Sequence, residues 1–174
     1  MTPQPEEGLA SGTTAILAST PKVLEALFDG QPEDALDRPG EEGWSPKDVL
    51  AHLISIQGPA LVDRVKAMLD SDLPLLPDAD EQKLLAASGL RGRAARELLQ
   101  TFCEQRAQAV SLLDRLRPAD LRRRGRHELA GEVSVADVIH HMAYHDLLHI
   151  AQAANLLAEP IRRRRGAMGE AFPT

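Results

Sequence analysis

Apolar residues recur at the spacing of an α-helix in four segments of this chain, and this pattern determines the class of fold. The segments cover approximately residues 9–28, 45–69, 91–116 and 134–157. Alanine and leucine dominate them, aromatic residues make up 3% of the chain, and stretches rich in β-branched residues are few. Amphipathic helices of this kind bury one face against each other. The pattern therefore predicts an all-α protein folded as a four-helix bundle.

Two of the expected helices begin with clear capping signals. Ser45 is followed three residues later by Asp48, and Ser134 is followed in the same way by Asp137. A serine that caps the third helical residue, whose acidic side chain bonds back to the cap, forms a capping box. These pairs predict that the second and fourth helices open at Ser45 and Ser134.

Prolines and glycines mark the expected interruptions. Pro21 lacks a backbone N–H and should kink or split the first helix, while Gly58–Pro59 should interrupt and kink the second. The fourth helix should end at about Leu157, before Pro160. Connections are predicted over residues 31–43, 71–80 and 117–133, with a short helix or turn near residues 81–87.

The length and charge of the chain limit its organisation and its partners. A chain of 174 residues predicts one domain over residues 1–174, with a core at about 9–158 and a tail over 159–174. The formal net charge of −6 is unfavourable for binding nucleic acid, and the arginine runs at 122–124 and 162–165 are expected on the solvated surface. No apolar stretch approaches the roughly 20 residues that span a bilayer. We therefore expect neither nucleic acid nor a membrane as a partner.

Cysteine usage and the first residues indicate where the protein works. Cys103 is the single cysteine, which excludes a disulfide framework and a cysteine-rich zinc module. Residues 1–10 contain two glutamates and no basic residue, unlike a secretory signal. A reducing cytoplasm is the expected location. Cys103 lies within a helix beside Phe102 and is predicted to be a core or boundary residue rather than a nucleophile.

Histidines gather on the fourth helix and form the strongest candidate site. Four of the six histidines lie between residues 140 and 149. His141, His145 and His149 are spaced four apart, so they form a stripe on one helix face, whereas His140 points about 100° away from His141. Two such histidines can direct ring nitrogens at one metal ion, and a facing helix can supply a third. His52 is the candidate for this third ligand because it lies on the apolar side of the second helix.

Two readings without metal remain open from the residues alone. The histidines can form a polar network in the core, or they can form a wet, exposed stripe. Other catalytic patterns are missing: the chain has no phosphate-binding glycine loop, and H-D-L-L-H at residues 145–149 lacks the glutamate of the H-E-x-x-H zinc proteases. Asp146 points away from the histidine face and is expected to contact a neighbouring helix or a dimer partner.

Two short motifs resemble a known family. Trp44-Ser45 followed by residues 48–53, which end in His52-Leu53, resembles the W-S-…-H-L opening of the second helix in the DinB-like (DinB/YfiT) superfamily of bacterial metalloenzymes. Residues 145–152 resemble the H-x-x-x-H-x-x-Q signature of its fourth helix. The resemblance covers approximately residues 10–157 and implies a four-helix bundle that often pairs as a homodimer.

The resemblance also implies a site and an activity. By position, His52, His145 and His149 correspond to the family's ligands for a divalent metal, for which zinc or nickel is expected. His141 would then be a fourth ligand, a partner of a ligand or a group that lines the pocket, with the last two favoured. Gln152 would support a ligand or line the pocket, and Trp44 would be structural. Characterised relatives include thiol S-transferases that use bacillithiol or mycothiol. A metal-dependent thiol S-transferase that acts on a small-molecule substrate is therefore the favoured function. Some related bundles are hydrolases or isomerases.

Two alternatives to an enzyme stay open. The bundle can be a non-catalytic, stress-associated binder of a metal or small ligand, or a structural dimer with a vestigial site. An open metal position beside an apolar pocket would favour the enzyme, and a closed or empty site the binder. No general base can be assigned from the sequence, because Asp48 and Asp137 have a sufficient role as helix caps.

Overall fold

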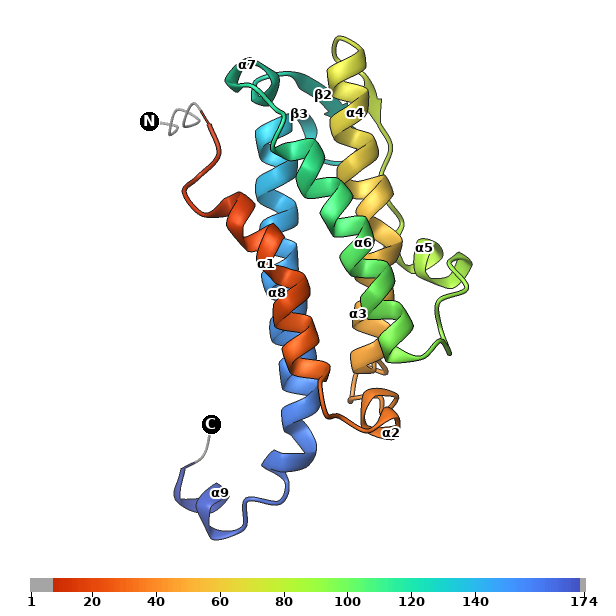
Figure 1. Cartoon of the computed structure of the whole chain (residues 1–174), viewed down its shortest axis with the longest axis vertical. Helices are drawn as coiled ribbons and strands as arrows, with labels where there is room; N and C mark the ends of the chain where they lie inside the picture. The colour runs from red at the N-terminus through yellow and green to blue at the C-terminus, as the bar shows by residue number, and fades with distance from the viewer. Residues whose placement is uncertain (1–7, 173–174) are drawn as a thin grey trace.

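The bundle consists of four long helical segments that run along the long axis of the molecule (Figure 1). The structure is a computed structural model and describes residues 8–172. The segments are α1 (Thr13–Phe28), a continuous run of α3 (Pro46–Ile56), the π-helix η1 (Gln57–Val62) and α4 (Asp63–Asp70), then α6 (Ala95–Leu113) and α8 (Val135–Arg162). The predicted all-α four-helix bundle is confirmed.

Each long helix packs against two others. α1 contacts α6 and α8, and α3 contacts the same two helices, so α3 and α8 are neighbours in the bundle. The core between them is mainly apolar; its completely buried side chains include Leu17, Leu24, Leu50, Phe102 and Ile139. The two helices that carry His52 and His145 therefore share one seam.

Both predicted capping boxes are present. Ser45 Oγ accepts from the backbone N–H of Asp48 at 3.1 Å, and the Asp48 carboxylate accepts from the N–H of Ser45 at 3.0 Å. Ser134 and Asp137 make the same reciprocal pair at 3.1 and 2.8 Å. These bonds satisfy N–H groups that a helix start leaves unpaired and so fix where α3 and α8 begin.

The first helix was predicted to kink or split at Pro21; the split is wrong, because α1 runs through Pro21 without a break. A proline removes the N–H that would bond to the carbonyl four residues earlier. That carbonyl belongs to Leu17, and it accepts a hydrogen bond from Arg106 Nη1 of α6 at 2.9 Å. A partner from another helix therefore replaces the lost helical bond.

The other two prolines also lie within helices. Gly58–Pro59 falls inside η1, where the backbone widens into a π-helix and then continues as α4. The fourth helix was predicted to end at about Leu157, but α8 continues through Pro160 to Arg162. The expected interruption of the second helix is thus a local change of helix type. The expected end of the fourth helix is wrong by about one turn.

The connections contain more structure than the sequence predicts. The short helix predicted near residues 81–87 is present as α5 (Glu81–Ala87). Three further short helices were not predicted: α2 (Glu33–Leu36), α7 (Pro118–Leu121) and α9 (Ala167–Ala171), the last in the predicted tail. β1 (Leu75–Leu76) pairs in parallel with β2 (Arg124–His127), which pairs antiparallel with β3 (Gly131–Ser134). This small sheet lies at the end of the bundle that also holds α7 (Figure 1). None of the helices in residues 8–172 combines the length and apolarity needed to cross a lipid bilayer.

Candidate metal centre

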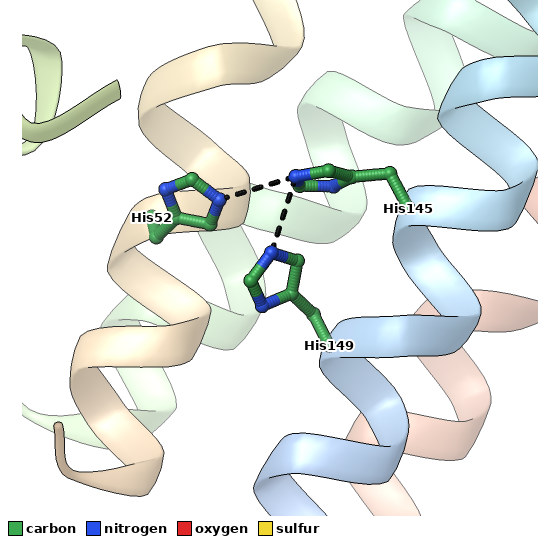
Figure 2. A group of neighbouring side chains, drawn as sticks. All are labelled: His52, His145 and His149. Atoms are coloured by element: carbon green, nitrogen blue, oxygen red, sulfur yellow. Dashed lines mark hydrogen bonds between the residues drawn. The ribbon is translucent and has the colours of Figure 1, made fainter. Parts of the chain in front are cut away.

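Three histidines meet at the seam between α3 and α8. His52 comes from α3, where its neighbours Val49 and Leu53 are buried. His145 and His149 come from successive turns of α8 and point toward α3 (Figure 2). His52 is completely buried, His145 is 8% exposed, and His149 is partly buried. The structure thus brings together the three residues predicted as metal ligands.

The ring nitrogens of these residues converge. His145 Nε2 lies 3.4 Å from His52 Nε2 and 3.1 Å from His149 Nε2, and one nitrogen of each ring lies within 4.8 Å of the others. Nitrogens that bind one zinc ion tetrahedrally at about 2.0–2.1 Å lie roughly 3.3 Å apart. Two of the three separations match that requirement and the third is at most 4.8 Å, so the three side chains can converge on one divalent ion.

The alternative of a polar network without metal leaves bonds unmade. A facing pair of neutral imidazole nitrogens can share only one proton, and three nitrogens around one point cannot all be satisfied by one another. In the part of the chain that the structure describes, His52 Nδ1 and His145 Nδ1 are also buried without a hydrogen-bond partner. Unsatisfied buried polar groups are costly. An ion between the Nε2 atoms would satisfy those three nitrogens, while the two Nδ1 atoms would keep their cost.

Gln152 fixes the orientation of one imidazole. Its Oε1 lies 2.7 Å from His149 Nδ1, so the ring donates its Nδ1 proton to the amide oxygen. The lone pair of His149 is then on Nε2, which faces the other two histidines. A partner on the second ring nitrogen commonly fixes a metal-binding histidine in this way. Gln152 therefore occupies the outer position that the family resemblance implies.

Two of the three histidines, His52 and His149, are held in the neutral form. Burial is the main cause that lowers the pKa of His52 to about 4, and repulsion from a charged His149 adds to it. Burial also lowers the pKa of His149, with His145 as the second cause. Neutral imidazole is the form that binds a metal. Near neutral pH these two residues are therefore ready to act as ligands without losing a proton.

An acidic side chain that sequence reasoning missed faces the same point. Glu81 is the first residue of α5, and its oxygens lie 3.6 Å from His145 Nε2 and 3.7 Å from His52 Nε2. Its contact with His145 is the main cause that lowers the pKa of Glu81, which keeps it ionised. The sequence predicted a helix or turn near residues 81–87, but it held no sign that this segment would lie over α3.

Trp44 and Gln152 border both the histidines and a surface groove. The Trp44 ring meets His52 edge-on, with 5.4 Å between centroids, and stacks at 6.5 Å against His149. Both residues also line a groove of about 890 Å³, whose other walls include Leu148 and Leu156. The groove therefore reaches two residues that contact the histidines, while the three histidines themselves are not among its lining residues.

The remaining histidines of the fourth helix lie outside the cluster. His141 is exposed, and its ring centroid lies 6.1 Å from that of His145. The Nε2 of His140 accepts from the backbone N–H of Ala10 at 2.8 Å. His141 is thus placed at the edge of the site, as a pocket residue would be, and His140 has a structural contact.

Two further predictions concern residues away from the metal centre. Cys103 is partly buried and donates to a Glu25 oxygen at 3.4 Å; burial first, and then Glu25, raises its pKa to about 11. Its thiol is therefore protonated near neutral pH and is no nucleophile. Asp146 is buried and contacts neighbouring helices through Arg106 of α6 and Thr20 of α1.

Comparisons with known proteins relate this fold and site to a family. The family model of the DinB superfamily matches residues 16–153, and a search of curated proteins found no match. Among solved structures, the chain is similar to YfiT from Bacillus subtilis, described as a probable metal-dependent hydrolase with an unusual four-helix bundle topology. The two are 19% identical with a TM-score of 0.78, over 91% of this chain and 93% of YfiT, so the likeness establishes the fold. Because the family model matches most of its length, this chain belongs to the DinB superfamily.

Proposed function

We propose that this protein is a metal-dependent thiol S-transferase, in which His52, His145 and His149 hold one zinc or nickel ion. The observation that carries the proposal is the convergence of three imidazole nitrogens at distances that match one coordination sphere. Three neutral nitrogen ligands with space for a further group are typical of catalytic rather than structural zinc sites. The membership in the DinB superfamily supports the same reading.

A bound divalent ion would supply a nucleophile near neutral pH by lowering the pKa of a thiol or water that binds to it. The residues of the chain position the reactants. Gln152 holds the His149 ring in place, and Trp44 packs against two of the histidines. The adjoining groove offers room for a low-molecular-weight thiol such as bacillithiol or mycothiol, and for the electrophile that receives it. Cys103 takes no part, because its thiol stays protonated.

A second candidate is metal-dependent hydrolysis. It is favoured by the likeness to YfiT, a probable metal-dependent hydrolase, and by the ionised Glu81 carboxylate beside His145. A carboxylate in that place can take a proton from an attacking water. The two activities share the metal centre and differ in whether a thiol or a water is the nucleophile.

The first experiment measures metal content. Protein purified without a histidine tag should contain about one divalent ion per chain, and the variants His52→Ala and His145→Ala should lose it. His141→Ala is the matched control, because that residue lies on the same helix face outside the cluster and should keep the ion. A wild-type protein that takes up neither zinc, nickel nor manganese would leave a polar histidine network and overturn the proposal.

The second experiment separates the candidate activities. The metal-loaded protein is assayed for transfer of bacillithiol, mycothiol or glutathione to a chromophoric aryl halide, and for hydrolysis of a chromophoric ester without thiol. Thiol transfer that His145→Ala abolishes would support the first candidate, and thiol-independent hydrolysis the second. Metal binding with neither reaction would favour the non-catalytic binder.

A further inference from the structure

The short helix α5 directs one acidic side chain at the candidate metal centre. α5 packs against α3, the helix that carries His52. Asp80 caps α5 by accepting from the N–H of Lys83 at 3.0 Å, and it also pairs with the Lys83 ammonium at 2.8 Å. Lys83 is therefore paired with Asp80. Glu81, at the first helical position, faces the histidines instead.

The two oxygens of Glu81 are divided between two of the imidazoles. Oε1 lies nearest to His145 Nε2, at 3.6 Å, and Oε2 nearest to His52 Nε2, at 3.7 Å. A separation of 3.6 Å is too long for a hydrogen bond, so the carboxylate faces these nitrogens without bonding to them. Within residues 8–172, both ion-pair contacts of Glu81 are with these two rings. The carboxylate thus faces His52 and His145, on one side of the histidine cluster.

The distances fit a shared ion better than a direct contact. Ligand atoms on one tetrahedral zinc ion, with bonds of about 2.0–2.2 Å to nitrogen and oxygen, lie roughly 3.3 Å apart. Each Glu81 oxygen exceeds this spacing by a few tenths of an ångström to the ring nearest to it. The carboxylate lies outside the set of ligand atoms that are within 4.8 Å of one another, so it would have to move toward His149 to share the ion. The side chain is 49% exposed, so a small rotation meets little steric resistance.

We propose that Glu81 is the fourth protein ligand of the metal ion, giving a site of three imidazoles and one carboxylate. The assignment rests on the proposed three-histidine centre and deepens it. A ligand on a half-exposed side chain of a short helix can leave the ion more easily than the buried histidines of α3 and α8. Glu81 would therefore hold the ion at rest and give up its place when a thiol or water binds.

The test is the metal affinity of the full-length protein, measured by competition with a chromophoric chelator. Glu81→Gln keeps the size of the side chain and removes its charge, and it should weaken zinc binding about tenfold or more, within the range seen when groups around a metal are altered. Glu132→Gln is the matched control, since Glu132 lies in β3 and pairs with Arg124 away from the site. The cobalt-loaded proteins provide a second readout, because the visible absorption of cobalt changes when a ligand is lost.

The outcomes separate this assignment from the metal site itself. Weaker zinc binding and an altered cobalt spectrum in Glu81→Gln alone would support it. Wild-type affinity together with an unchanged cobalt spectrum would overturn it, while the three-histidine site would stand. A wild-type protein that binds no metal at all would overturn both. Equal thermal stability of the metal-free variants would show that Glu81→Gln has not disturbed the fold.

Discussion

Gln152 acts at the scale of one hydrogen bond, by selecting the nitrogen that His149 offers to a metal. The Nδ1–H of His149 donates to the amide oxygen at 2.7 Å, which leaves the lone pair on Nε2. Replacement of Gln152 by Leu removes that acceptor and allows the ring to turn or change tautomer. We expect zinc affinity to fall about 10–100-fold in this variant, measured by chelator competition. Gln152→Glu keeps an acceptor and should stay close to wild type; equal binding by the Leu variant would refute the role.

The buried His52 makes the stability of the metal-free protein depend on pH. Its pKa is lowered from 6.5 to about 4 in the folded protein, mainly by burial. As the pH falls from about 6.5 to 4, His52 binds a proton in the unfolded chain but not in the folded protein, so the free energy of unfolding decreases. This pKa shift contributes roughly 3 kcal/mol to the free energy of unfolding, and the contribution is fully present above pH 6.5.

Urea denaturation at a series of pH values, with a chelator present, checks this expectation. The slope between pH 6.5 and 4 should be shallower in His52→Gln than in the wild-type protein, since the glutamine does not titrate. Parallel profiles for the two proteins would show that His52 titrates at its ordinary pKa in the folded state.

The residues of the site differ in how far the sequence could predict them. His145 and His149 are one turn apart on one helix, so local geometry alone joins them. His52 required an additional assumption, that the apolar face of its helix meets the fourth helix. Glu81 had no such signal, because its place beside His145 depends on how the connection before α6 folds back over α3. Side chains that reach a site from short, irregular segments depend on contacts that the local pattern does not encode.

At the scale of helices, a buried ion pair ties three of them together. Arg106 of α6 forms a two-bond pair with Asp146 of α8, with 3.0 Å between Nη2 and Oδ1, and Thr20 of α1 donates to the same carboxylate at 2.7 Å. Arg106 also bonds to the Leu17 carbonyl and to Gln57 of η1. Both charged residues are at most 1% exposed. Because Asp146 follows His145, this network also fixes the rotation of α8 that turns His145 toward α3.

Removing one partner of this pair should be strongly destabilising. Asp146→Ala leaves the Arg106 guanidinium buried without its counter-charge, and we expect a loss of about 3–5 kcal/mol in the free energy of unfolding. Arg106→Met combined with Asp146→Leu should recover part of the loss, because no charge then remains buried. Urea denaturation followed by circular dichroism measures both variants. A loss below about 1 kcal/mol in Asp146→Ala would contradict the view that the pair is essential.

The sequence predicted the helix boundaries that local contacts set, and it missed those that depend on distant residues. The starts at Ser45 and Ser134 are encoded locally by capping boxes, and both were predicted. The continuity of α1 through Pro21 depends on Arg106, which lies far away in the sequence. The three strands were missed for a related reason. They have at most four residues each, and β1 pairs with β2 about 50 residues further along the chain.

At the scale of the whole molecule, the bundle leaves one side of its longest helix uncovered. Tyr144, Leu147, Leu148 and Ala151 are exposed on α8 at spacings of three and four residues, so they form one stripe. The opposite side of the same helix is buried and carries Ala143, Asp146 and Ala153. Large apolar side chains gathered on one face are characteristic of a surface that contacts another protein.

We expect this stripe to form the contact of a homodimer, as the family resemblance implies. A two-fold axis would pair α8 with its own copy and bury the apolar side chains of both. Leu148 and Ala151 also line the groove beside Trp44 and Gln152, so the α8 of the second copy would form part of the wall of that groove. Light scattering after size-exclusion chromatography should give twice the chain mass of 18.9 kDa for the wild-type protein. The double variant Leu147→Glu, Leu148→Glu should be monomeric, because charges would be buried at the contact. Leu129→Glu is the matched control, since Leu129 is 77% exposed in the turn between β2 and β3, away from α8. A wild-type protein that is monomeric at micromolar concentrations, or a double variant that stays dimeric, would show that this face is not the contact.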